Sequence, residues 1–236
     1  MREIRLDGPG KNSLGTAMLT FLVDQLREAA GEPVLLTGAG NALSAGLDLK
    51  ELGSLEGEAM LGFLQLLEKA VAALYLYPGA TVALVNGHAI AGGCVLTLAC
   101  DHRVAVANPK IKIGLNEVAI GLRFPPRILA MVKQRVPVRF HTEVLLGAQL
   151  FDPAGALRAG IVDEVVEAEG ARSAAEGKLE KLGKSPRGAY ALTKEDLRGT
   201  DQDLCPDAAW EPRLRGAVAQ WTSPEIKQKI AAMLAR

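Results

Sequence analysis

Apolar and polar residues form two recurring patterns along the first two thirds of the chain. Apolar residues recur at helical spacing in two long segments, 14–30 and 62–77, which predicts two amphipathic helices. Short apolar or alternating runs predict strands at 2–6, 33–37, 81–85, 103–107, 110–113 and 161–166. Shorter helices are predicted at 48–52, 94–100, 125–136, 138–146 and 152–160, and loops at 8–14, 38–46 and 114–122. Strands that alternate with helices in this way are typical of an α/β fold.

The pattern changes after about residue 169, where only helices are predicted. Their expected positions are 171–182, 186–198, 204–221 and 224–236. We therefore expect an α/β core at 1–168 and a C-terminal helical region at 169–236. Helices this short need tertiary partners. Their apolar side chains could pack on the core or on a neighbouring subunit: Trp210, Trp221, Ile226, Ile230 and Met233.

Composition narrows the possible functions. The 236 residues are 49% hydrophobic, enough for one sizeable domain. Lysine and arginine together number 27, as do aspartate and glutamate. Because no net charge attracts phosphates or anionic lipids, we expect neither nucleic acid nor a membrane as a partner.

The cysteines and the N-terminal residues bear on the compartment. Cys94, Cys100 and Cys205 form no CxxC pair and are odd in number, so we expect buried thiols in a reducing compartment and no metal site. The first residues, MREIRLDG, contain neither an apolar secretory core nor an amphipathic leader. No apolar run approaches the roughly 20 residues of a spanning helix. The expected location is therefore cytoplasmic.

One stretch, NGHAIAGGCVLTLACD from Asn86 to Asp101, has the order strand end, turn, glycine bend and apolar helix. Gly92 and Gly93 permit backbone conformations that a Cβ forbids. The first amides of a helix lack internal partners and can stabilise a developing negative charge on a carbonyl oxygen. The alternative is that these glycines only allow close packing.

Glu117 is the most interesting charged residue. It lies between apolar residues in IGLNEVAIG, and the predicted strands at 103–113 bring it back toward the glycine bend. A carboxylate with apolar surroundings becomes more basic and could take a proton from a carbon acid. The alternatives are a solvated loop glutamate or a helix cap. His88 and His102 are weaker candidates, and no serine or cysteine stands in a nucleophile motif.

Three motifs occur in an order and spacing that resemble those of the crotonase, or enoyl-CoA hydratase/isomerase, superfamily. They are LSAGLDLKEL from Leu43, AIAGGCVLTLACD from Ala89 and IGLNEVAIG from Ile113. LFDPAGALRAGIVDEVV from Leu150 extends the likeness over nearly the whole chain. The resemblance implies a spiral of ββα units followed by helices that pack trimers or hexamers. It also implies that the family's first strand pair is trimmed, because little precedes Asn12.

The resemblance also implies roles for residues. The backbone amides of Leu47 and Gly92 would hold the thioester oxygen of an acyl-CoA, next to Ala45, Gly46 and Gly93. Lys50 matches a position that approaches the CoA phosphates, so coenzyme A enters as part of the substrate and no separate cofactor is implied. Apolar side chains would line the acyl site: Val95, Leu115, Val118, Ile120 and Leu122. We expect its depth to be set by Phe63, Leu66, Leu67 and the loop 52–60.

One departure from the hydratases of this family bears on the reaction. Those enzymes use two glutamates, whereas this chain has Val95 at the first position and Glu117 at the second. Adding water needs two proton-handling groups, but a 1,3 proton shift needs only one base. The chain therefore most resembles the monofunctional Δ3,Δ2-enoyl-CoA isomerases. The alternatives are an enoyl-CoA hydratase and a non-catalytic acyl-CoA-binding homologue.

Overall fold

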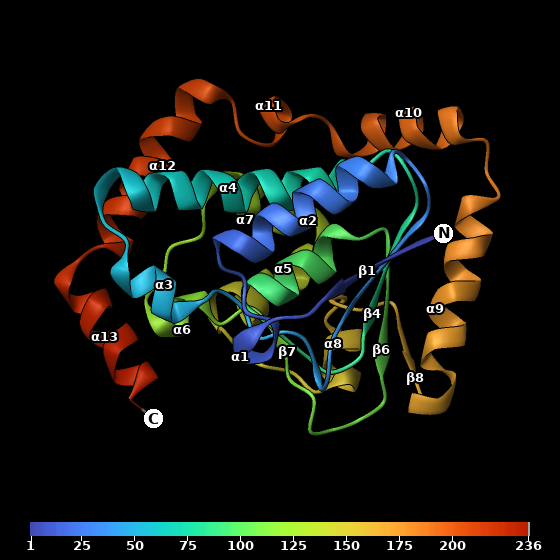
Figure 1. Ribbon diagram of the computed structural model, residues 1–236, viewed down its shortest axis with the longest axis horizontal. Coiled ribbons are helices and arrows are strands. Elements are labelled where there is room, and N and C mark those ends of the chain that lie inside the picture. The colour runs from blue at the N-terminus through green and yellow to red at the C-terminus, as the bar shows by residue number, and fades with distance from the viewer. Residues whose placement is uncertain (236) are drawn as a thin grey trace.

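Two parallel sheets form the centre of the molecule in the computed structural model, which describes residues 1–235 (Figure 1). The larger sheet has the strand order β1-β2-β4-β6-β8, with β1 at Arg2–Leu6, β2 at Val34–Gly38, β4 at Thr81–Val85, β6 at His102–Val106 and β8 at Glu164–Val166. The smaller sheet has the order β3-β5-β7, with β3 at Ala42–Ser44, β5 at His88–Ile90 and β7 at Ile113–Gly114. All strand pairs in both sheets are parallel.

Successive strand pairs contribute one strand to each sheet and are followed by helices. The pair β2 and β3 precedes α3 (Leu49–Ser54) and α4 (Gly57–Tyr75), β4 and β5 precede α5 (Gly92–Ala99), and β6 and β7 precede α6 (Glu117–Ile120). This repetition confirms the predicted crotonase-like spiral of ββα units. The remaining helices of the core are α1 (Pro9–Asn12), α2 (Thr16–Ala29), α7 (Pro126–Arg135) and α8 (Pro153–Arg158), with a 3-10 turn at Val138–Phe140 and a π-helical turn at Thr142–Leu146.

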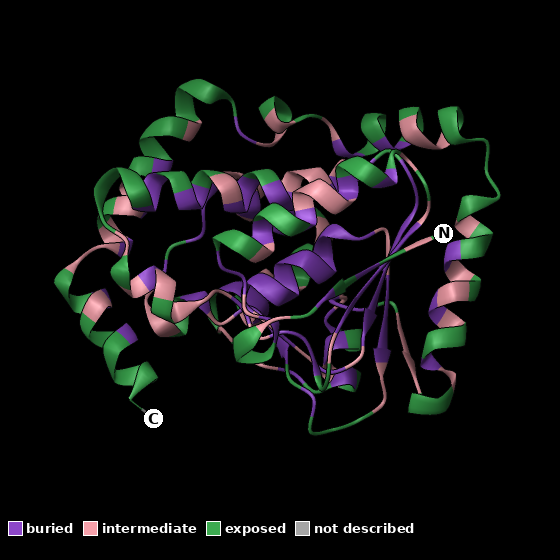
Figure 2. Ribbon diagram, in the orientation of Figure 1, coloured by how far each residue is buried: buried purple, intermediate pink, exposed green. Residues whose placement is uncertain are grey.

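Helix α5 lies at the centre of the core, and all eight of its residues are buried (Figure 2). A helix that is apolar on every side needs neighbours on every side. Contacts with α4, α7 and the smaller sheet supply them. The three predicted buried thiols are free and buried, two of them at or next to this helix. Because α5 cannot move without disturbing the core, its first residues are rigidly placed.

The C-terminal helices pack on the same core. Helix α9 (Ala168–Gly183) covers the outer face of the larger sheet, with Ala171, Ala175 and Leu179 against strand residues such as Val82 and Val104. The chain continues through α10 (Arg187–Arg198), α11 (Asp201–Leu204), α12 (Asp207–Trp221) and α13 (Pro224–Leu234), which run around the periphery in Figure 1. The boundary at 168 and the oligomerisation role of 169–236 remain predictions, and Arg236 lies outside the described residues.

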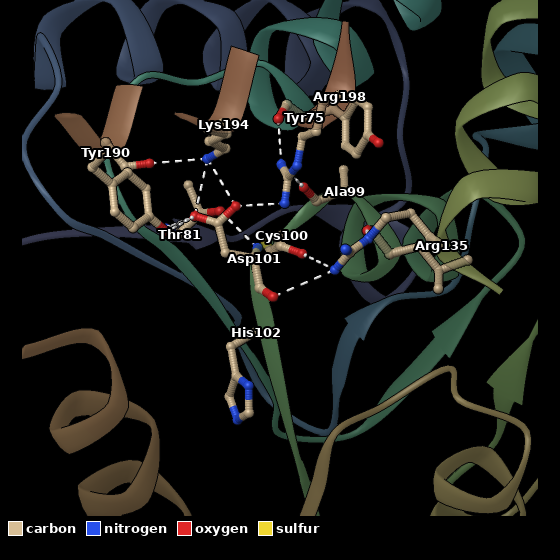
Figure 3. Close-up of polar contacts among 12 residues, drawn as sticks. Tyr75, Thr81, Ala99, Cys100, Asp101, His102, Arg135, Tyr190, Lys194 and Arg198 are labelled. Carbon is tan, nitrogen blue, oxygen red and sulfur yellow. Dashed lines mark hydrogen bonds and ion pairs between the residues drawn. The ribbon is translucent and has the colours of Figure 1, made fainter. Parts of the chain in front are cut away.

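A buried charged cluster fixes α10 to the core (Figure 3). Asp101, just after α5, accepts hydrogen bonds from the Thr81 N–H at 2.8 Å and the Tyr190 hydroxyl at 2.8 Å. It also pairs with Lys194 and Arg198, whose side chains are nearly fully buried. The network therefore ties one end of α5 to the C-terminal helices.

Several predicted elements differ from the structure. The predicted strand at 110–113 is reduced to β7, because the Lys110 and Ile111 amides donate to Asn108 and continue the turn. The strand predicted at 161–166 begins only at 164, because the Ile161 amide donates to a carbonyl of α8.

Other differences concern helices and loops. The helix predicted at 204–221 is interrupted at Pro206, and 138–146 is not α-helical. The predicted loops contain α1, β3 and α6. Within residues 1–235, no helix combines the length and the apolar character needed to cross a membrane.

Candidate active site

A cavity of about 90 Å³ lies beside the start of α5 and contains most of the residues singled out in the sequence. Ala45, Leu47, Gly92 and Glu117 line it. Its walls are otherwise mainly apolar and come from elements far apart in sequence, including Leu67, Val95, Ile120, Ile128, Trp221 and Met233. A small apolar cavity with a few polar groups is the usual form of a small-molecule site.

Two backbone segments meet at one side of this cavity. Gly46 has φ +99°, and a Cβ there would lie 3.0 Å from the Ile90 carbonyl oxygen, so the position requires glycine. A Cβ on Gly92 would lie 3.4 Å from the Leu47 side chain and 3.8 Å from the Gly46 Cα. Within residues 1–235, neither the Leu47 N–H nor the Gly92 N–H donates a hydrogen bond. Two unused donors therefore lie on adjacent segments at one cavity.

The residue before α5 has an unusual backbone conformation. Ala91 has φ +49° and ψ −119°, a region that residues with a Cβ rarely adopt. Such conformations persist only where the surroundings impose them, and they concentrate at functional sites. Here the conformation joins β5 to α5 so that the helix begins directly at the cavity.

Glu117 is the first residue of α6 and is only 7% exposed. Its Oε2 atom is buried and has no hydrogen-bond partner among the described residues. Burial raises the pKa of this carboxyl group to about 7, and its own backbone amide opposes the change only in part. Near neutral pH the group can therefore both take up and release a proton, as an acid–base catalyst must.

No second acid accompanies Glu117. Among the described residues that line the cavity, Glu117 is the only ionisable side chain, and Val95 contributes an apolar wall from α5. Asn116, which sequence reasoning did not single out, also lines the cavity, and its Oδ1 has no hydrogen-bond partner within residues 1–235. The signal that could have found Asn116 is its place immediately before the proposed base.

The structure separates the predicted site residues into three groups. Ala45, Leu47, Gly92, Val95, Ile120 and Glu117 line the cavity, as does Leu122. Gly46 and Gly93 are not among the lining residues but allow close packing, because a Cβ on Gly93 would lie 2.3 Å from the Ser44 carbonyl oxygen. Lys50 is exposed on α3. The catalytic and binding roles of all these residues remain predictions.

Four residues that the sequence places at the acyl site do not line the cavity. Leu115 is fully buried in the main core, and Val118 lines a neighbouring groove. Of the three side chains expected to set the depth, only Leu67 lines the cavity. Phe63 is buried in the main core, and Leu66 packs against that core. Residues 52–60, expected to form a loop, contribute nothing to the lining and belong mainly to α3 and α4.

A family model described as enoyl-CoA hydratase/isomerase matches residues 1–213. The chain belongs to the enoyl-CoA hydratase/isomerase family. It is 32% identical over 200 residues to human mitochondrial enoyl-CoA delta isomerase 1, a match that covers 83% of this chain and 66% of the human protein, just under two thirds. A putative enoyl-CoA hydratase from Thermus thermophilus is 32% identical over 203 residues, covering 81% of this chain and 77% of the relative.

Solved structures of the family agree with the fold. The crystal structure of human mitochondrial delta3-delta2-enoyl-CoA isomerase matches with a TM-score of 0.89 and 30% identity, covering 97% of this chain and 90% of that chain. The crystal structure of an enoyl-CoA hydratase from Bacillus halodurans matches with a TM-score of 0.85 and 26% identity, covering 98% of this chain and 95% of that chain. The family and the crotonase-like fold predicted from the sequence are confirmed. The proteins similar to this chain therefore include both isomerases and hydratases.

Proposed function

We propose that this protein is an enoyl-CoA isomerase that converts 3-enoyl-CoA to 2-trans-enoyl-CoA in fatty-acid oxidation or related acyl-CoA metabolism. The observation that carries the proposal is the buried carboxyl group of Glu117, whose Oε2 has no partner among residues 1–235, in a cavity with two backbone N–H groups that donate to no other described residue. The similarity to human enoyl-CoA delta isomerase 1 supports the same substrate class. Coenzyme A would be part of the substrate, with no separate cofactor.

The proposed reaction begins with the thioester oxygen accepting hydrogen bonds from the Leu47 and Gly92 amides. The Glu117 carboxylate removes a proton from carbon 2, and the electron pair moves into a dienolate whose charge rests largely on the thioester oxygen. The protonated Glu117 then delivers that proton to carbon 4, which leaves the double bond between carbons 2 and 3. Each amide that stabilises the oxyanion contributes about 3 to 4 kcal/mol to lowering the barrier.

The environment of Glu117 suits this cycle. A carboxyl group that ordinarily titrates near 4.5 is a weak base at neutral pH, whereas burial raises the pKa of Glu117 to about 7. The group then accepts a proton from carbon 2 more readily and can still return it to carbon 4. Apolar walls such as Val95 keep water away from the dienolate.

Other parts of the proposal rest on the family resemblance. Lys50, exposed on α3, would contact the CoA phosphates. A homotrimer or hexamer and a cytoplasmic location complete the proposal.

Hydration is the second candidate reaction because hydratases occur among the similar proteins. Water addition needs a second group to handle a proton, and among the described residues that line the cavity the only polar side chain beside Glu117 that is not an indole is the neutral amide of Asn116. Isomerisation is therefore the better fit. A non-catalytic acyl-CoA binder would not require a buried carboxyl oxygen without a partner.

The deciding experiment compares Glu117→Gln with the wild type on panels of 3-enoyl-CoA and 2-enoyl-CoA esters, reading double-bond migration and hydration in parallel. We expect Glu117→Gln to lower the rate of migration about 10²- to 10⁴-fold, because loss of a general base has that effect. The matched control is Glu68→Gln on α4, which alters another buried carboxyl group that lies outside the cavity.

Two results would contradict the proposal. One is a folded Glu117→Gln protein that retains full isomerase turnover. The other is wild-type protein that hydrates 2-enoyl-CoA faster than it shifts the double bond of 3-enoyl-CoA. Binding of acyl-CoA without either reaction would instead favour the non-catalytic alternative.

A further inference from the structure

A short segment separates the proposed active-site cavity from a larger groove on the surface. Leu122 and Phe124 line both hollows. The groove has a volume of about 410 Å³, and apolar residues including Leu129, Leu145 and Leu146 line it. We call residues 121–124 the partition, because the cavity lies on one side of them and the groove on the other.

Helix α12 holds the partition through two consecutive side chains. Gln220 accepts a hydrogen bond from the Arg123 N–H at 3.1 Å and donates one to the Gly121 carbonyl oxygen. The Trp221 indole N–H donates to the Arg123 carbonyl oxygen at 2.8 Å. Backbone groups of Gly121 and Arg123 are thus bonded to α12, which fixes the partition in place.

The residues that line the cavity differ in exposure. Leu67, Ile128 and Trp221 are each at most 3% exposed, whereas Met233 is 39% exposed. The cavity, at about 90 Å³, is much smaller than the groove, at about 410 Å³. A long acyl chain would gain room if the partition moved.

We propose that the partition, held by Gln220 and Trp221, sets the upper limit on acyl chain length and makes short chains the preferred substrates. This inference rests on the proposed function for the identity of the ligand. Trp221 and Gln220 determine specificity without touching the reacting atoms. When their hydrogen bonds are removed, the partition loosens and the tail of a longer chain reaches the groove, where Leu129, Leu145 and Leu146 lie.

The test measures the affinity of saturated acyl-CoAs with 4 to 16 carbons for the full-length protein. In the wild type, affinity should rise about fourfold for each added methylene until the cavity is full, and then level off or fall. Gln220→Met removes both hydrogen bonds from Gln220, and Trp221→Phe removes the indole donor. In each variant we expect the rise to continue for at least two to four further carbons. Turnover of 3-enoyl-CoA esters should follow the same profile.

The matched control is Trp210→Phe, on the same helix. Its indole N–H donates to Glu68 and makes no hydrogen bond with the partition, so its chain-length profile should equal that of the wild type. The inference is overturned if the wild type binds chains of 12 to 16 carbons on the rising slope, or if both Gln220→Met and Trp221→Phe keep the wild-type limit.

Binding and turnover separate the two proposals. Because saturated acyl-CoAs bind without reacting, a chain-length limit that shifts in the variants supports the partition even in a protein without isomerase activity. Isomerase activity with no limit, or with an unmoved limit, rejects the partition and leaves the proposed function intact.

Discussion

Two buried carboxyl groups lie near opposite ends of α5 and have opposite surroundings. Asp101, beyond the C-terminal end, accepts hydrogen bonds from Thr81, Tyr190 and two buried cations (Figure 3). Glu117, in the cavity at the N-terminal end, has an oxygen with no partner. Burial alone would raise the pKa of Asp101, but the nearby positive charges lower it below its ordinary value. Burial raises the pKa of Glu117 to about 7.

The comparison distinguishes a carboxylate that stabilises the fold from one that is available for chemistry. A buried charge that is paired and hydrogen-bonded can be tolerated, whereas an unpaired one destabilises the native state. Glu117 therefore opposes folding whenever it is ionised. Strongly perturbed groups of this kind concentrate at functional sites.

The largest expected effect on stability is at Asp101. Asp101→Asn leaves the buried charges of Lys194 and Arg198 without their carboxylate and should lower the free energy of unfolding by about 3 to 5 kcal/mol. Chemical denaturation at neutral pH measures this change. Any variant protein that remains folded should retain isomerase turnover, because Asp101 lies outside the proposed site.

A milder change at the same cluster provides the control. Tyr190→Phe removes one neutral donor to Asp101 and should cost only about 1 kcal/mol. If Asp101→Asn is no less stable than Tyr190→Phe, the cluster does not hold α10 to the core.

Glu117→Gln should have the opposite effect on stability, and the effect should depend on pH. The folded-state pKa of Glu117 is raised from 4.5 to about 7, so native protein keeps a proton that unfolded protein loses. Wild-type stability should therefore fall as pH rises from about 4.5 to 7. At pH 8 we expect Glu117→Gln to be more stable than the wild type by on the order of 1 to 3 kcal/mol. At pH 4 the two proteins should differ little in stability, because Glu117 is then mostly protonated in both the folded and the unfolded wild type.

Denaturation of both proteins at pH 4 and pH 8 tests this difference. Equal stability of the two at both values would show that ionising Glu117 does not oppose folding. Asp101 should show the reverse dependence. Its pKa is lowered in the folded protein, so its contribution to stability is present above its ordinary pKa and is lost as the pH falls below that pKa.

Long periodic segments made much of the fold predictable from the sequence. The apolar spacing of 62–77 identified most of α4, although the helix begins earlier, at Gly57. The strands β3 and β7 have three and two residues, too few to show alternation. The apolar pair Ile161-Val162 predicted strand, but the sequence could not show that their amides bond back to Ala156 in α8.

The candidate site was predictable only where it is local in sequence. Glu117 and the glycine bend at Gly92 stand in recognisable motifs, and the structure places them at one cavity. Trp221 was identified only as an apolar residue, because its position at the cavity depends on how α12 packs. Leu115 was expected in the wall, but the chain direction after β7 turns it into the core and gives Asn116 the cavity position.

The pH dependence of turnover compares the two carboxyl groups directly. In the proposed reaction, Glu117 must be ionised to remove the carbon-2 proton, so kcat/KM for 3-enoyl-CoA should rise about tenfold per pH unit below pH 7 and level off above it. Measurement of kcat/KM from pH 5 to 9 gives the midpoint. Folded Asp101→Asn protein should have the same midpoint, because Asp101 does not line the cavity. A wild-type midpoint near 4.5 would mean that burial does not keep Glu117 protonated in the free enzyme, and the contrast with Asp101 would then be one of hydrogen bonding alone.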